Sequence, residues 1–147
     1  MTLVLRVVSK KDTGVTTNVT TDTTTAVSVV SVVAIVGSRN YHNYDNLKQY
    51  VDQWIKVNGP IKTIVSGGAK GVDTLARRYA TEHNINLVEF YPDWSTYGEA
   101  AGMIRNTDII NHATHVIAFP SRNGKGTQDS IRKSLKQGKP IYAYYID

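Results

Sequence analysis

The stretch Val32-Val33-Ala34-Ile35-Val36-Gly37-Ser38-Arg39 decides the fold of this chain. Five apolar residues in a row are typical of a strand buried on both faces. The glycine turn that follows lets backbone N–H groups approach a ligand without a Cβ in the way. Two further glycine turns stand at the ends of apolar runs, Val65-Ser66-Gly67-Gly68-Ala69-Lys70-Gly71 and Pro120-Ser121-Arg122-Asn123-Gly124-Lys125-Gly126-Thr127. Because a glycine turn that opens a helix is a ready anion site, three of them predict a phosphate-bearing ligand held by several loops.

Strand and helix patterns alternate from residue 31 to the end of the chain. After Asp45, read as an N-cap, apolar residues recur at helical spacing until Gly59-Pro60, as the series Leu47, Tyr50, Val51, Trp54, Ile55. Further strands are expected at 63–66, 87–91, 114–119 and 141–145. Further helices are expected near 72–80, 99–113 and 126–137, with a loop over 92–98. This alternation predicts an α/β fold, a Rossmann-like, doubly wound, mostly parallel five-stranded sheet with helices on both faces.

In such sheets ligands bind outside the carboxyl ends of the strands, at the topological switch point. All three glycine turns follow strands, so all three are expected on that edge.

Residues 1–30 form a different segment, rich in threonine and valine. These residue types favour strands, and the segment predicts two or three antiparallel strands added to the main domain, residues 31–147. A small sheet of this kind needs a cover, so it packs on its own domain or on a second subunit. We expect a homo-oligomer on this ground. A partly disordered, threonine-rich tail is the alternative.

Composition narrows the class of protein. The 147 residues contain no cysteine, which excludes disulfides and thiolate metal sites, and carry a formal charge of +5, which favours anionic ligands without proving nucleic-acid binding. No apolar run approaches the ~18 residues that a membrane span needs, and the N-terminus does not read as a secretory signal. We therefore expect a cytoplasmic protein with no membrane partner.

Five blocks, in order and spacing, resemble a known family. They are Val36-Gly37-Ser38-Arg39, Ser66-Gly67-Gly68-Ala69-Lys70-Gly71-Val72-Asp73, Pro92-Asp93-Trp94, Ala101-Gly102-Met103-Ile104-Arg105-Asn106, and Phe119-Pro120 through Gly126-Thr127. Residues 32–145 resemble the SLOG superfamily of Rossmann-like proteins, within it the YspA/YpsA-related family. The resemblance implies binding of a nucleotide or nucleotide-derived ligand. Related LOG enzymes are phosphoribohydrolases of nucleoside monophosphates, and related DprA/Smf proteins bind single-stranded DNA.

The chain departs from the LOG signature Pro-Gly-Gly-x-Gly-Thr-x-x-Glu. Three residues after Thr127 stands Ser130 in place of the glutamate that helps catalysis, and Asp129 precedes it. The departure puts LOG-type hydrolysis in doubt and leaves a phosphate-binding loop. If the protein were such an enzyme, Arg105 would hold the phosphoribosyl group and Asp129 or Asp73 would supply the carboxylate.

Candidate ligand-binding residues come from all of these blocks. Arg39 and Arg105 offer planar guanidinium forks suited to phosphate. Asp73, in the first turn of its helix, either binds a ribose hydroxyl or complements the helix dipole. Trp94, with Tyr97, either stacks on a base or anchors its own loop. The full candidate set is Gly37, Ser38, Arg39, Gly67, Gly68, Ala69, Gly71, Asp73, Trp94, Arg105, Asn106, Gly124, Gly126 and Thr127.

No metal or cofactor is expected. His112 and His115 straddle a helix end and a strand start, with no carboxylate at a matching spacing. The basic C-terminal run fits a solvated helix face, with single-stranded nucleic acid as the alternative; it comprises Arg122, Lys125, Arg132, Lys133, Lys136 and Lys139. The sequence favours a binder of a nucleotide or nucleotide-derived ligand, a sensing or sequestering protein. A LOG-like phosphoribohydrolase and a single-stranded nucleic-acid binder are the alternatives.

Overall fold

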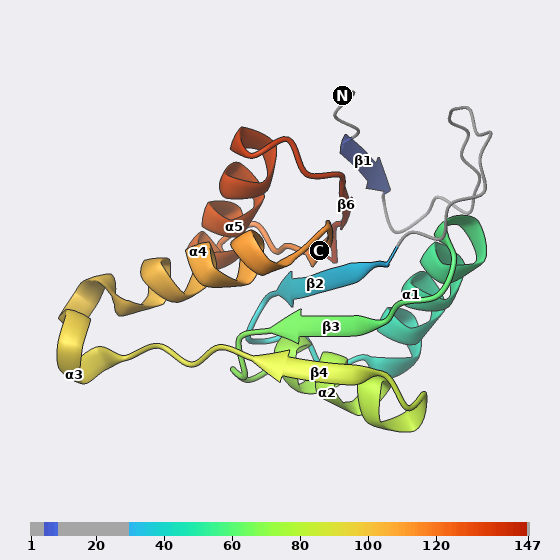
Figure 1. The fold of residues 1–147 in the computed structure, drawn as a ribbon, viewed down its shortest axis with the longest axis horizontal. Helices are drawn as coiled ribbons and strands as arrows, with labels where there is room; N and C mark the ends of the chain where they lie inside the picture. The colour runs from blue at the N-terminus through green and yellow to red at the C-terminus, as the bar shows by residue number, and fades with distance from the viewer. Residues whose placement is uncertain (1–4, 9–29, 147) are drawn as a thin grey trace.

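A computed structural model describes residues 5–8 and 30–146, which form a parallel six-stranded sheet with helices on both faces (Figure 1). The strands are β1 (Leu5–Val8), β2 (Val32–Gly37), β3 (Thr63–Ser66), β4 (Asn86–Glu89), β5 (His115–Phe119) and β6 (Ile141–Tyr144). Their order across the sheet is β1-β6-β5-β2-β3-β4, and every neighbouring pair is parallel. The predicted Rossmann-like α/β fold is confirmed.

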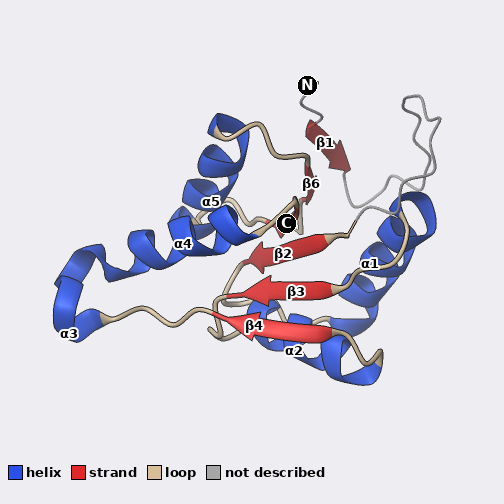
Figure 2. Ribbon diagram, in the orientation of Figure 1, coloured by secondary structure: helices blue, strands red, loops and turns tan. Residues whose placement is uncertain are grey.

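Alternate residues of the central strands bury on opposite faces, because successive side chains of a strand point to opposite sides. Helices α1 (Tyr44–Asn58) and α2 (Val72–Glu82) cover one face, and α4 (Ala101–His112) and α5 (Lys125–Lys136) cover the other (Figure 2). In β2, Val33 and Ile35 belong to the first core, and Ala34 and Val36 belong to the second. This double burial explains the uninterrupted apolar run of the sequence.

Helix α1 begins two residues earlier than the sequence suggested. Its N-cap is Asn43, whose side-chain oxygen accepts a hydrogen bond from the backbone N–H of Asn46 at 3.1 Å. The prediction of Asp45 as the cap was wrong; Asp45 lies in the first turn, where a carboxylate complements the helix dipole. The helix ends at Gly59, as expected, with φ of 97°.

The segment between β4 and α4 is helical where a loop was predicted. A short helix, α3 (Trp94–Tyr97), and a 3-10 turn, η1 (Gly98–Ala100), precede α4, which starts at Ala101. Asp93 caps α3, since its carboxylate accepts from the backbone N–H of Thr96 at 3.1 Å and from the hydroxyl of Ser95 at 2.9 Å. In Figure 1 this segment extends away from the sheet, beyond the carboxyl ends of the strands.

The N-terminal strand differs from its prediction. Leu5–Val8 pair with β6 in parallel, from Leu5 beside Ile141 to Val8 beside Tyr144, so antiparallel pairing is wrong for this strand. Its partner lies more than 130 residues away, from Leu5 to Ile141, and local patterning cannot reveal such a partner. The rest of the predicted extension lies outside the described residues. Among the described residues, no helix has the length and apolar character that a bilayer span requires.

The chain reverses its direction across the sheet between β2 and β5. From β2 it proceeds outward to β3 and β4, and it then returns to β5 on the other side of β2. The loops that follow β2 and β5 therefore leave the carboxyl ends of these two strands in opposite directions. Such a point is where α/β proteins form ligand crevices.

Candidate nucleotide-binding site

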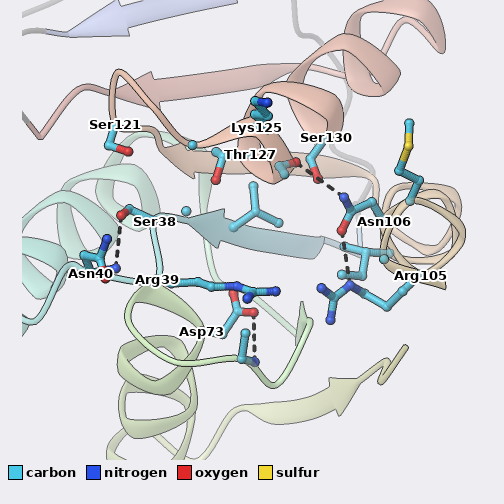
Figure 3. A pocket seen from close by; sticks show the side chains of 18 of the residues that line it. Ser38, Arg39, Asn40, Asp73, Arg105, Asn106, Ser121, Lys125, Thr127 and Ser130 are labelled. Atoms are coloured by element: carbon cyan, nitrogen blue, oxygen red, sulfur yellow. Dashed lines mark hydrogen bonds between the residues drawn. The ribbon is translucent and has the colours of Figure 1, made fainter. Parts of the chain in front are cut away.

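A cavity of about 410 Å³ opens at this switch point (Figure 3). The turns after β2, β3 and β5 contribute to its wall, together with one face of α4 and the start of α5. The cavity is within the size range of small-molecule sites. The predicted convergence of the loops on this edge is what the structure shows, although the three loops contribute unequally.

The N-terminus of α5 supplies free hydrogen-bond donors. Its N-cap, Gly124, makes no side-chain cap bond. The backbone N–H groups of the next three residues, Lys125 to Thr127, donate to no described residue. The side chains of Thr127 and Ser130 are buried, 6% and 2% exposed, and their hydroxyls have no hydrogen-bond partner among the described residues. Both residues line the cavity, so their hydroxyls are free to hydrogen bond to a ligand or water there.

Arg105 projects a buried guanidinium to the same cavity. Its Nη1 donates to the carbonyl oxygen of Gly67 at 2.7 Å and to that of Phe90 at 3.3 Å, and its Nε donates to Oδ1 of Asn106 at 3.1 Å. Nη2 is left without an acceptor among the described residues, although the side chain is only 9% exposed. Burial lowers the pKa of Arg105, the charge of Arg39 acts in the same direction, and Asp73 opposes the shift. A guanidinium stays protonated at neutral pH, so Arg105 presents a fixed positive charge.

Asn106 ties α4 to α5. Its Nδ2 donates to a carboxylate oxygen of Asp129 at 3.2 Å and to the carbonyl oxygen of Gly126 at 3.4 Å, while its Oδ1 accepts from Arg105. Asp129 also accepts from Lys133 at 2.7 Å and from Arg132 at 3.3 Å. Asn106 and Asp129 therefore form their hydrogen bonds with other residues of the protein. These bonds orient Arg105 relative to the start of α5.

The turn after β2 adds a second guanidinium. Arg39 is exposed and forms no ion pair with a described carboxylate. Figure 3 shows its side chain extending across the cavity in the direction of Arg105. Ser38 accepts a hydrogen bond from the backbone N–H of Asn40 at 3.1 Å and so shapes the turn. Two like charges side by side are unfavourable unless an anion lies between them, so this pair favours an anionic ligand.

The second glycine turn gives the cavity few residues. Ala69 and Asp73 line it, whereas Gly67, Gly68 and Gly71 do not. A Cβ on Gly68 would lie 2.4 Å from the ring of Tyr91, and one on Gly71 would lie 2.3 Å from the carbonyl oxygen of Ser38. These glycines allow close packing of the loop, and a ligand contact by them remains a prediction.

Asp73 closes the same loop. Its carboxylate accepts from the backbone N–H of Ala69 at 3.1 Å, and burial raises the pKa of Asp73 above its ordinary value against the opposing effects of that bond and of Arg105. A buried carboxylate beside a cation-rich cavity is placed to accept from a ligand hydroxyl.

Trp94 lies outside the cavity lining. It is 54% exposed on α3, and its ring reaches the first turn of α4, where a Cβ on Gly102 would be 3.7 Å from Cη2. The other predicted lining residues, Gly37, Gly124, Gly126 and Thr127, do line the cavity. The described residues contain no group of three or more side chains able to hold a metal ion.

Several residues that line the cavity were not among the predicted ligand-binding residues. They are Asn40, Glu99, Gly102, Met103, Ser121, Asn123, Lys125 and Ser130, with apolar Val36 and Ile109. Glu99, Gly102, Met103 and Asn106 stand at i, i+3, i+4 and i+7, which puts them on one helical face. That spacing was available in the sequence, but nothing local showed that this face of α4 meets the cavity.

Comparison with known proteins identifies the family. A model of the YspA, cpYpsA-related SLOG family matches residues 31–97. Gene 61 protein of Mycobacterium phage D29 is 32% identical over 84 residues, which are 53% of this chain and 67% of the phage protein. The chain belongs to the YspA, cpYpsA-related SLOG family. The family match covers the first two glycine turns of this SLOG domain and ends at Tyr97, before α4 and α5.

Two solved structures share the fold of the SLOG domain. DNA processing protein A from Helicobacter pylori, described for its single-stranded DNA binding mode, is 22% identical with a TM-score of 0.59, over 77% of this chain and 64% of that one. DprA from Streptococcus pneumoniae is 20% identical with a TM-score of 0.61, over 78% of this chain and 50% of that one. The present chain thus spans about half to two thirds of these proteins, and the likeness is one of fold.

Proposed function

We propose that this protein binds a nucleotide or nucleotide-derived ligand through its phosphate, in a sensing or sequestering role. The observation that carries the proposal is the uncapped start of α5, where Thr127 and Ser130 line the cavity with hydroxyls that no described residue binds. Backbone N–H groups at a helix N-terminus favour an anion through both hydrogen bonds and the helix dipole. Arg105 and Arg39 add two positive charges to the same cavity.

The charged groups favour binding over hydrolysis. Of the two carboxylates that a LOG-like reaction would use, Asp129 is engaged by Asn106, Arg132 and Lys133. Asp73 lines the cavity, but it holds the backbone of Ala69. The proposal includes a cytoplasmic location, because nucleotides are present in the cytoplasm.

Mass spectrometry of the small molecules released from the purified, denatured full-length protein tests the proposal. Recovery of an intact phosphorylated nucleotide or a derivative of one is the expected result. Incubation with a panel of nucleoside monophosphates should release no free base, since release would make the protein a phosphoribohydrolase. Binding to single-stranded DNA whose affinity falls steeply with salt, with no small-molecule ligand, would favour the nucleic-acid alternative instead.

Arg105→Lys tests the phosphate contact while keeping the charge. One ammonium cannot replace the three bonds to Gly67, Phe90 and Asn106 and still donate to a ligand. We expect affinity for nucleoside monophosphates to fall about tenfold to a hundredfold, since a charge-assisted hydrogen bond contributes roughly 1.5–3 kcal/mol. Affinity for the matching nucleosides should change little in the same calorimetric titrations.

Arg78→Lys is the matched control, because Arg78 pairs with Glu82 on the surface of α2 and does not line the cavity. Equal losses for nucleotides and nucleosides in Arg105→Lys would show that Arg105 supports the fold and does not contact phosphate.

A homo-oligomer remains a prediction. Leu5–Val8 occupy the open edge of β6 within their own chain, so this strand has a partner without a second subunit. Static light scattering of the full-length protein at micromolar concentration should give at least the mass of a dimer. A monomer mass would overturn the prediction and leave the proposed ligand site intact.

A further inference from the structure

The cavity extends along α4, and its two ends have different linings. Asn106, Met103 and Gly102 of α4, and Glu99 of the 3-10 turn η1 before it, line the cavity in succession from its inner end to its rim. At about 1.5 Å per residue these residues span about 10 Å. The inner end meets Arg105, Thr127 and Ser130, and the outer end meets the short helix α3.

The outer end is apolar and open. Met103 is 54% exposed, and Gly102 has no side chain to cover the ring of Trp94, which lies against it. Trp94 is itself 54% exposed. An exposed indole and a thioether beside a cavity form a flat, polarizable surface of the kind on which bases stack.

The charges also differ between the two ends. Glu99 lines the rim and forms no ion pair with a described cation. A carboxylate accepts hydrogen bonds and repels phosphate, whereas the inner end carries the free donors of α5 and the guanidinium of Arg105. The phosphate of a bound nucleotide therefore belongs at the inner end.

We infer that the outer end is a base-binding subsite, in which the nucleobase lies over Gly102 and Met103 and stacks on Trp94. The inference rests on the proposed function and adds to it the orientation of the ligand: phosphate inward at α5, base outward at α3. Trp94 then takes part in binding. Gly102, which has no side chain, lets the base reach the indole.

Titrations with four nucleoside 5′-monophosphates and ribose 5-phosphate test the subsite. The full-length protein should bind at least one monophosphate more tightly than ribose 5-phosphate, with quenching of tryptophan fluorescence. Trp54 is 2% exposed in the core and should not respond. In Trp94→Leu the affinity for the monophosphate should fall roughly fivefold to a hundredfold, the quenching should disappear, and the affinity for ribose 5-phosphate should not change.

Two further variants sharpen the result. Gly102→Val places a side chain between the cavity and Trp94 and should produce the same selective loss. Tyr97→Leu removes the other exposed aromatic ring of α3, which does not contact Gly102, and should bind like the wild type.

The outcomes separate the two proposals. Equal binding of monophosphates and ribose 5-phosphate by the wild type, or equal losses for both in Trp94→Leu, would overturn the base subsite and leave phosphate binding standing. Binding of none of the five compounds would overturn the subsite together with the proposed function.

Discussion

Gly124→Asp is expected to weaken phosphate binding by about a hundredfold or more while leaving the protein folded. Gly124 is the N-cap of α5, with φ of −85° and ψ of 92°, a backbone conformation open to any residue, and a Cβ there would require a small shift of Ser121, whose Oγ would lie 3.2 Å away. An aspartate there would accept from the free N–H groups of the first turn, as N-cap carboxylates do, and gain a few tenths of a kcal/mol over glycine. The same carboxylate would occupy the place of a phosphate and repel it.

The expected loss of affinity for nucleoside monophosphates is about a hundredfold or more, because two charge-assisted bonds are replaced and a like charge is added. Calorimetric titration gives the affinity, and thermal unfolding gives the stability. Gly124→Asn, which caps without a charge, should show an intermediate loss. Arg78→Lys, which lies away from the cavity, is the neutral control. Unchanged binding in Gly124→Asp would remove the start of α5 from the site.

Gly71→Ala is expected to destabilise the fold strongly. Gly71 has φ of 73°, and a Cβ would lie 2.3 Å from the carbonyl oxygen of Ser38 and 2.5 Å from the carbonyl carbon of Arg39. Both are backbone atoms and cannot move aside easily. Backbone strain and overpacking each cost about 1–3 kcal/mol. The free energy of unfolding should therefore fall by about 3 kcal/mol or more, and the melting temperature by about 10 °C.

Gly138→Ala provides the matched comparison in urea or thermal unfolding. Gly138 has nearly the same φ, 71°, but a Cβ there meets nothing within 4 Å. This variant should show the strain alone, about 1 kcal/mol. Equal destabilisation of the two variants would mean that contact between the first two glycine turns contributes nothing to the fold.

The sequence predicted the sheet well because its signals are local. The apolar runs of β2 and β5 and the helical spacing in α1 and α2 lie within single elements, and the parallel order follows from their alternation. The partner of β1 could not be predicted, since the pairing of Leu5 with Ile141 depends on the assembled sheet. The short α3 was missed because four residues carry too little periodicity between Pro92 and Gly98.

The edge that carries the candidate site could be predicted from the rule that parallel strands end together. Which glycines face the ligand cavity and which allow close packing could not be predicted. A glycine such as Gly71, with a positive φ, is needed whether the loop packs on a ligand or on Ser38. Likewise, only the packing of α4 on α5 shows that Asn106 and Asp129 bind each other. Lys125 and Ser130 line the cavity because they lie on α5, and no local pattern in the sequence singles them out.

The central claim is that the cavity at the β2–β5 switch point binds a nucleotide through its phosphate. Calorimetric titration of the full-length protein with nucleoside 5′-mono- and diphosphates and with the matching nucleosides, at one fixed salt concentration, tests it most directly. The account predicts that at least one nucleotide binds with one site per chain, and that its nucleoside binds at least about tenfold more weakly. No binding by any nucleotide, or equal binding by nucleotide and nucleoside, would contradict it.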